Sequence, residues 1–280
     1  MSAEMRRTRY QNGDLRRGLA LAAALTLAAC ARPTPADRAA DVATPPPSDT
    51  SGYLVPPLVL DAQRGVDGSV VVSGRSGPQV RVRLSTPPPA SMAYGATAGE
   101  GGGWSIATPA STGVQLYGVA EELVGRDVQG EGYVATLPGP GPAGVLLRAG
   151  GGAAVLIKSG GALKIAAVDY DSSGSALVSG LARSGASARL TIDGAAAGEA
   201  RVNDHGRFSI SLTGGLQPGD HQAVVQAGDQ SFSVKFTVAH PGPITGLPYR
   251  GQRTPAGWRI DWLTPGGGAQ TTQIFDAAES

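Results

Sequence analysis

An all-β fold built from antiparallel β-sandwiches is the architecture that the sequence predicts. Three observations support this prediction: apolar and polar residues alternate with a period of two, turn-forming residues separate the alternating runs, and similar segments occur twice. Gly (42) and Pro (21) are abundant, and aromatic residues make up only 5% of the chain. We therefore expect frequent turns, and cores made mainly of Val, Leu, Ile and Ala.

The alternating runs are clearest in the second half of the chain. Residues 186–192, 208–212 and 231–238 each place an apolar side chain at every second position, which gives a strand one buried and one solvated face. Residues 80–84 show the same alternation in the first half. Helical periodicity is nearly absent, and the best short helical candidate is Val119–Val124. Short strands at this spacing favour antiparallel sandwiches.

Three short segments recur in the same order, which indicates a duplicated unit of roughly 100 residues. Each segment alone is rich in glycine and matches easily by chance, whereas the ordered set supports a duplication. The pairs are GSVVVSG (Gly68–Gly74) with GSALVSG (Gly174–Gly180), GGWSI (Gly102–Ile106) with GRFSI (Gly206–Ile210), and PAGVLLRAGGGA (Pro142–Ala153) with PAGWRIDWLTPGGGA (Pro255–Ala269).

The first 29 residues are expected to be a secretory signal peptide. Several arginines precede an apolar stretch, Gly18–Ala29, that would be about 18 Å long as a helix and is too short for a ~30 Å hydrocarbon layer. A basic start, a short apolar centre and small residues at its end are the parts of an export signal. Residues 31–54, with five prolines, then predict an extended tether.

The signal ends at Leu27, Ala28, Ala29 and Cys30, and this tetrapeptide resembles the bacterial lipobox. The resemblance implies that Leu27, Ala28 and Ala29 are recognised by the signal peptidase, which cleaves before Cys30. It also implies covalent diacylglycerol and an N-acyl lipid such as palmitate on Cys30, and several chains hold a protein on a membrane stably. Ala31, in place of an Asp, favours the outer membrane. The alternative is an ordinary secretory signal with an incidental cysteine.

The second half contains SALVSGLARSGASARLTIDG (175–194), VNDHGRFSISL (202–212) and LQPGDHQAVVQA (216–227). Together these segments resemble the immunoglobulin-like (Ig-like) domains of bacterial surface and envelope proteins. The resemblance implies two tandem Ig-like antiparallel β-sandwich modules, but it does not indicate what they bind. The predicted organisation is a signal peptide at 1–29, a lipidated Cys30 and Pro-rich linker at 30–56, a first sandwich with a hairpin at 57–160, and a second sandwich with a C-terminal hairpin at 161–280.

Each predicted module ends in a β-hairpin, at 144–157 and at 257–275, with a glycine-rich connection. In the second hairpin, Trp258, Ile260 and Trp262 fall on one face of a strand. Trp258 and Trp262 are our candidate ligand platform, on which a glycan or a peptide would stack. The other interpretation is that the two indoles cover an open end of the sandwich, since a Trp side chain buries a large area.

Two acidic residues, Asp169 and Asp171 in DYDSSG, match the start of a calcium loop, but the position that needs a Glu holds Gly180. The sequence leaves open a calcium site or a solvated linker at this point, and we predict no metal site. The three histidines lie in or beside turns and form no acid–base grouping that we recognise, so the sequence predicts neither an enzyme nor a dissociable cofactor. The net charge of +1 excludes a large basic surplus for nucleic acid.

Two function hypotheses follow from these observations. The first is a lipid-anchored, non-enzymatic cell-envelope protein, at the outer membrane, whose two Ig-like modules form a binding or spacer surface. Its partners would be the membrane, through the anchor, and an envelope protein or glycan. The alternative is a carbohydrate- or peptidoglycan-binding lipoprotein that uses the aromatic C-terminal hairpin. Exposure or burial of Trp258 and Trp262 distinguishes the two hypotheses.

Overall fold

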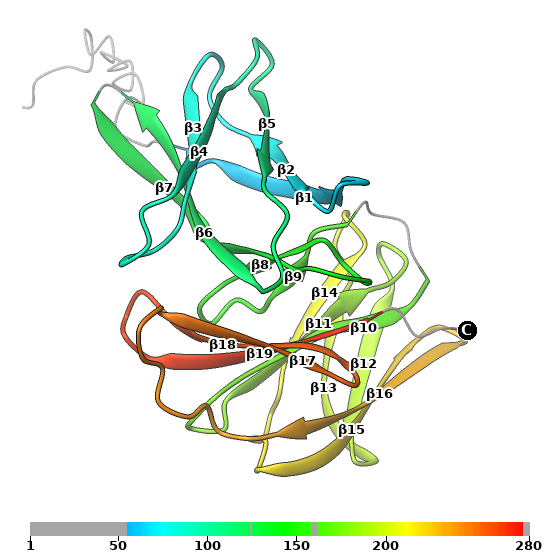
Figure 1. The fold of residues 1–280 in the computed structure, drawn as a ribbon. Helices are drawn as coiled ribbons and strands as arrows, with labels where there is room; N and C mark the ends of the chain where they lie inside the picture. The colour runs from blue at the N-terminus through cyan, green and yellow to red at the C-terminus, as the bar shows by residue number, and fades with distance from the viewer. Residues whose placement is uncertain (1–54, 124, 158–161, 277–280) are drawn as a thin grey trace, which may run out of the picture. The chain divides into compact units, whose positions relative to one another are not determined.

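The computed structural model describes residues 55–123, 125–157 and 162–276. These residues form nineteen β-strands in four antiparallel sheets and contain no helix, which confirms the predicted all-β antiparallel architecture (Figure 1). Accordingly, none of them belongs to a helix that is long and apolar enough to cross a membrane. The predicted signal peptide, the lipobox residues and Cys30 lie outside the described residues.

The first module contains β1 (Leu58–Arg64), β2 (Val70–Arg75), β3 (Arg81–Ser85), β4 (Ala93–Thr97), β5 (Gly103–Thr108), β6 (Gln115–Leu123), β7 (Arg126–Thr136), β8 (Gly144–Leu147) and β9 (Ala154–Val155). They form a three-stranded sheet in the order β1-β2-β5 and a six-stranded sheet in the order β4-β3-β6-β7-β8-β9. The predicted alternation is observed in β3, where Val82 and Leu84 are fully buried while Arg81 and Arg83 are exposed. The core between the two sheets contains Val72, Leu84, Trp104, Tyr117 and Val134, among others.

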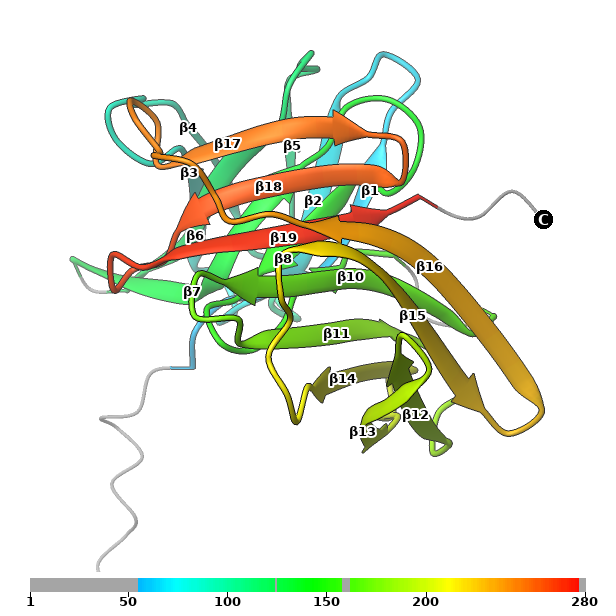
Figure 2. The same cartoon turned by 90° about the horizontal axis from the view of Figure 1, so that it is seen from below.

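The second module contains β10 (Lys164–Asp171), β11 (Ala176–Leu181), β12 (Ser187–Ile192), β13 (Ala195–Arg201), β14 (Arg207–Ser211), β15 (Gly219–Ala227), β16 (Gln230–Val238), β17 (Tyr249–Thr254), β18 (Gly257–Leu263) and β19 (Ala269–Phe275). A six-stranded sheet has the order β14-β11-β10-β19-β18-β17, which Figure 2 shows side by side, and a four-stranded sheet has the order β13-β12-β15-β16. Their shared core contains Val178, Leu190, Ile210, Val225 and Phe236, among others.

The two modules repeat one topology. The order β1-β2-β5 corresponds to β10-β11-β14, and β4-β3-β6-β7 corresponds to β13-β12-β15-β16. Both copies place a glycine beneath an aromatic ring: a Cβ on Gly74 would lie 2.4 Å from the ring of Trp104, and a Cβ on Gly180 would lie 2.3 Å from the ring of Phe208. This close approach explains why the segments GSVVVSG and GSALVSG share their final glycine.

The two predicted hairpins are confirmed, since β8 pairs with β9 and β18 pairs with β19. They are not separate appendices, however, because each extends a sheet. The hairpin β8–β9 lies beside β7, whereas the hairpin β18–β19 lies beside β10 and is joined by β17, a strand that the sequence pattern did not predict. The two hairpins therefore extend different sheets of the repeated topology, and the counterpart of each extended sheet has no such extension.

The helical candidate Val119–Val124 is wrong. Residues 119–123 belong to β6, which pairs with β3 on one side and with β7 on the other. An isolated turn of helix is only marginally stable, so pairing with two neighbouring strands outweighs the local helical preference. The predicted boundary between residues 160 and 161 lies outside the described residues, and no described sheet combines strands from both modules.

Candidate functional site

The candidate site is the junction between the two modules (Figure 1). It contains a third hydrophobic core. The six-stranded sheet of the first module contributes apolar side chains such as Val145 and Leu147 of β8. The six-stranded sheet of the second module contributes Trp258, Ile260 and Trp262 of β18, which share a face as predicted. The two hairpins that the sequence predicted therefore contribute to the same core.

The proposed aromatic ligand platform is wrong. Trp262 is completely buried and Trp258 is only 9% exposed. Neither ring face is therefore free to stack on a glycan or peptide. The Trp262 indole N–H donates a hydrogen bond to Oγ1 of Thr272 at 3.1 Å, and its ring meets that of Tyr133 edge to face at 6.1 Å. The indoles lie between the modules rather than over an open end of one sandwich, which also corrects the other interpretation.

Hydrogen bonds from the second module hold the chain that follows β8. Asp169 of β10 accepts a hydrogen bond from the N–H of Ala153 at 2.7 Å. Ser179 of β11 donates its hydroxyl to the carbonyl oxygen of the same residue at 2.6 Å. All of these groups are buried, and a buried backbone polar group needs such a partner. The two side chains therefore satisfy the Ala153 peptide at the junction.

Arg207 of β14 continues this set of contacts. Its guanidinium donates to the carbonyl oxygen of Val155 at 2.6 Å and to that of Ile157 at 3.2 Å. Gly152, which precedes Ala153, allows this segment to approach β11 closely. It has a φ of +74°, and a Cβ there would lie 2.3 Å from Leu177. The glycine-rich connection of the first hairpin thus has a packing function at the junction.

Asp169 is the central polar group of the junction, and its carboxylate has three partners. Besides the Ala153 N–H, it accepts hydrogen bonds from Thr272 at 2.6 Å and from Gln270 at 3.3 Å. Burial raises the pKa of Asp169, and these three hydrogen bonds oppose that shift by stabilising the charged form. The interpretation of this segment as a solvated linker is wrong for Asp169, which lies within β10 and is only 3% exposed.

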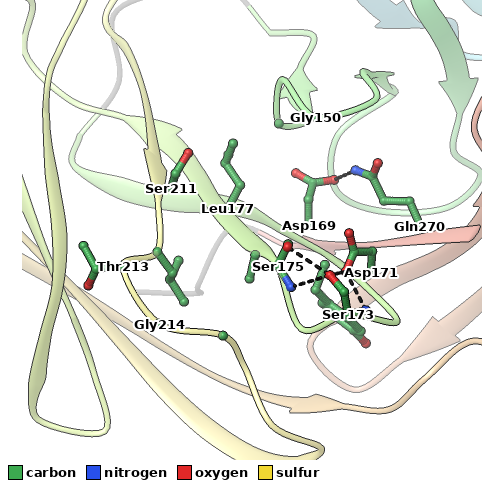
Figure 3. A pocket seen from close by; sticks show the side chains of 15 residues that line it. Gly150, Asp169, Asp171, Ser173, Ser175, Leu177, Ser211, Thr213, Gly214 and Gln270 are labelled. Carbon is green, nitrogen blue, oxygen red and sulfur yellow. Dashed lines mark hydrogen bonds between the residues drawn. The ribbon is translucent and has the colours of Figure 1, made fainter. Parts of the chain in front are cut away.

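A pocket of about 520 Å³ opens beside Asp169 (Figure 3). The second acidic residue of DYDSSG, Asp171, caps a turn there and accepts hydrogen bonds from the backbone and the hydroxyl of Ser173, at 2.8 and 2.6 Å. Both carboxylates thus have protein donors, and no group of three or more potential metal-binding side chains was found in the described ranges. Hydroxyl groups also line the pocket, from Ser173, Ser175, Ser211 and Thr213.

A second pocket, of about 750 Å³, lies beside the four-stranded sheet of the second module. His221 borders it and lies in β15 rather than in a turn; its ring nitrogens are 2.7 Å from Oδ2 of Asp193 and 2.7 Å from the carbonyl oxygen of Gln217. Arg259 also lines it, and donates to Oδ1 of the buried Asp261 at 2.9 Å. These groups form internal polar networks at the wall of the pocket.

The sequence did not identify Ser179, Arg207 or Thr272 as junction residues. Their strand alternation would have placed them on one face of their strands, but only the three-dimensional arrangement shows that the other module covers this face. A polar residue in an otherwise apolar strand, such as Asp169 after Ile165–Val168, is a signal that could have indicated a buried polar position.

No family model and no curated protein sequence matches the chain. Solved structures with a similar β-architecture include the BSP domain of a biofilm-associated protein (16% identity, TM-score 0.23) and the central fibronectin-III array of RIM-binding protein (13%, 0.24). A Ca²⁺-stabilized adhesin that helps an Antarctic bacterium reach out and bind ice is a third (14%, 0.21). The matches cover 67%, 79% and 79% of this chain, and 30%, 89% and 66% of those chains, respectively. We therefore infer function from the contacts of this chain alone.

Proposed function

We propose that the protein is a lipid-anchored, non-enzymatic component of the cell envelope in which two Ig-like modules act together as one stiff spacer or binding arm. The observation that supports this proposal is the third core at the junction. Tandem domains joined only by a linker are expected to move relative to each other, unless their interface is large and hydrophobic. Here Trp262, Ile260 and Leu147 are completely buried at the interface.

The polar contacts support a single arrangement of the modules. Hydrophobic contact alone is not directional, whereas Asp169, Ser179 and Arg207 each bond to particular backbone groups of residues 153–157. Sliding one module over the other would leave these buried groups without partners, which is costly. The modules would therefore keep a fixed relative orientation.

Our proposal assigns no catalysis and no dissociable cofactor to this chain. Catalytic acids and bases need a free position beside a substrate, but Asp169 already accepts three hydrogen bonds and both ring nitrogens of His221 have partners. The pockets are instead walled by groups that satisfy one another. A surface for an envelope protein or glycan fits this arrangement better than a reaction site does.

The anchor in this proposal is Cys30, following the lipobox residues Leu27, Ala28 and Ala29. The Pro-rich segment after Cys30 would act as a tether between the modules and the membrane, and Ala31 favours the outer membrane. Labelling of growing cells with radioactive palmitate tests this part of the proposal. We expect a labelled band for the natural chain and none for Cys30→Ala, and equal labelling of both would overturn the anchor.

Distance measurements between spin labels test the stiff arm. One chain that carries Cys30→Ala would have two introduced cysteines, Val66→Cys in the first module and Asp229→Cys in the second module. Both positions are exposed and can therefore carry a spin label. A single narrow distance distribution is expected, as narrow as that of the control pair Asp204→Cys and Asp229→Cys within the second module. A distribution much broader than the control would contradict the stiff arm, whatever the result of the palmitate experiment.

A further inference from the structure

The four sheets end in edge strands whose unpaired backbone groups invite pairing with another strand. Seven of the eight edges in the described ranges carry features that oppose such pairing. Strands β4, β5, β9, β14 and β17 are at most six residues long, and β1 and β13 contain bulges. The eighth edge, β16, differs from all of them.

β16 is a long and regular edge strand. It has nine residues, and all nine pair with β15 in one continuous register from Gly219↔Val238 to Ala227↔Gln230. It contains no proline and no bulge, and Lys235 is its only charged residue. Natural edge strands of this length usually contain a proline or a bulge.

Two hydrogen bonds show which backbone groups of β16 point away from β15. Gln222 of β15 bonds through its N–H and its carbonyl to Asp193, on the side away from β16. Its partner Lys235 is therefore in a non-hydrogen-bonded pair and directs its own N–H and carbonyl outward. The carbonyl of Thr237, two residues further along, also points away from β15, because it accepts a hydrogen bond from Gln273. Ser231 and Ser233 have the same parity and also direct their backbone groups outward.

The first module shows that this edge accepts a further strand. β7 is the counterpart of β16, and there β8 pairs with it from Tyr133↔Leu147 to Thr136↔Gly144. In the second module the corresponding hairpin lies on β10 instead, and no described strand pairs with the outer edge of β16. The edge that is filled in one copy of the duplication is open in the other.

The side chains of β16 are complementary to a second copy of the same strand. Antiparallel pairing about a two-fold axis at Ser233 would place Ser231 opposite Lys235 of the second copy on the outer face, with no like charges opposed. On the inner face it would place Phe232 opposite Val234, and both side chains are only partly buried in the single chain. Such pairing would extend their apolar row across the new contact.

We propose that β16 pairs with β16 of a second copy of this chain, antiparallel about a two-fold axis at Ser233, so that two four-stranded sheets become one continuous sheet. The open part of the strand, Ser231–Lys235, suffices for this register. The register also avoids Thr237, whose carbonyl is occupied by Gln273. The proposed contact goes beyond the stiff arm and does not depend on the lipid anchor.

Sedimentation equilibrium of the full chain carrying Cys30→Ala tests this pairing without interference from the lipid or the native thiol. We expect a concentration-dependent dimer that Ser233→Pro weakens about tenfold or more, because proline removes two symmetric N–H donors at the axis. The outward N–H of Ser233 makes no bond to β15, so this variant should keep its circular dichroism spectrum and thermal midpoint. A dimer that survives Ser233→Pro unchanged would overturn the proposal, since its contact would lie elsewhere.

A disulfide provides the second measurement, for the case in which the proline variant does not fold. Residues in a hydrogen-bonded antiparallel pair have Cα atoms about 5.5 Å apart, within the range that a disulfide spans. In the same Cys30→Ala chain, Ser233→Cys should form a covalent dimer on mild oxidation. Ser187→Cys, an exposed serine on the interior strand β12 of the same sheet, is the matched control. Crosslinking of Ser233→Cys no faster than that of Ser187→Cys would overturn the proposal.

Discussion

The two hairpins of the duplicated unit have similar sequences but different positions. PAGVLL forms β8 and lies beside β7, whereas PAGWRI opens β18, whose partner β19 lies beside β10. Val145 and Trp258, at matching positions, both reach the third core. The next residues differ in kind: Leu146 packs into the core of the first module, while Arg259 bonds to Asp261 and to the carbonyl of Ala239.

This difference shows what a repeated motif determines. The shared sequence produces a hairpin with one apolar face in both copies, and that face is buried at the junction in both. The residues on the opposite face match the different positions of the hairpins: the apolar Leu146 packs in a sandwich core, and Arg259 lines a pocket within a polar network.

The largest effect is expected for the shared face. Trp262→Ala should lower the free energy of unfolding by about 3–5 kcal/mol, and Leu147→Ala on the facing hairpin by about 2–5 kcal/mol, because both truncations leave cavities in the third core. Urea unfolding followed by tryptophan fluorescence would measure both losses. The control Leu60→Ala, at an exposed position, should change little. A Trp262→Ala loss no larger than that of this control would show that the junction contributes little.

The second largest loss of stability is expected for the opposite face of the second hairpin. Asp261 is buried and accepts hydrogen bonds from Arg259, Arg250 and Thr271, at 2.9, 2.8 and 2.7 Å. Asp261→Ala leaves the largely buried Arg259 without its carboxylate and should cost about 3 kcal/mol. The double variant Arg259→Leu with Asp261→Leu makes this face apolar, as Leu146 is, and should cost much less. Chemical denaturation of both variants decides whether polarity or packing matters here.

A smaller effect is expected for the carboxylate at the junction. Asp169→Asn replaces one acceptor oxygen with a donor, leaves one of its three partners unsatisfied, and should cost about 1–3 kcal/mol. Asp171→Asn, at the exposed turn, is the matched control and should cost less. Because burial raises the pKa of Asp169, its ionisation should disfavour the folded state as pH rises through that pKa. Stability measured from pH 3 to 8 should show this decrease in the natural chain and not in Asp169→Asn.

The smallest effect is expected for His221, which borders the pocket next to Arg259. Burial alone would lower the pKa of His221, but hydrogen bonds to Asp193 and Gln217 outweigh burial and raise it. A raised pKa in the folded state means that the stabilisation is complete below the unfolded value of about 6.5 and is lost as pH rises through the folded value. Thermal midpoints should therefore decrease slightly over that range, and His221→Gln should remove the decrease. An unchanged pH profile in this variant would exclude His221 as the titrating group.

The sequence predicted much of the fold because period-two alternation directly reflects which face of a strand is buried. The runs 186–192, 208–212 and 231–238 correspond to β12, β14 and β16 with shifts of one residue at some ends. β17 was missed because YRGQRT has no apolar alternation: it is an edge strand whose central residues are exposed. The pairing partners that make it a strand lie in β18.

The site was less predictable, and the tryptophans show why. Alternation correctly placed Trp258, Ile260 and Trp262 on one face, but it does not reveal whether solvent or another module covers that face. Similarly, DYDSSG gave no indication that Asp169 faces Ala153, because contacts between modules connect residues that local patterns treat separately. Even within the second module, the hydrogen bond from Thr272 to Asp169 joins positions 103 residues apart.

The position of β19 has a consequence for how the chain acquires its structure. β19 is the last described strand, yet it lies in the middle of its sheet, between β10 and β18. Because β10 and β18 are joined only through β19, the sheet that covers the junction is incomplete until β19 is in place, and the apolar surface of the junction stays uncovered until then. We expect deletion of residues 269–275 to split this sheet and expose that surface, which makes the loss of one strand far more damaging than its length suggests.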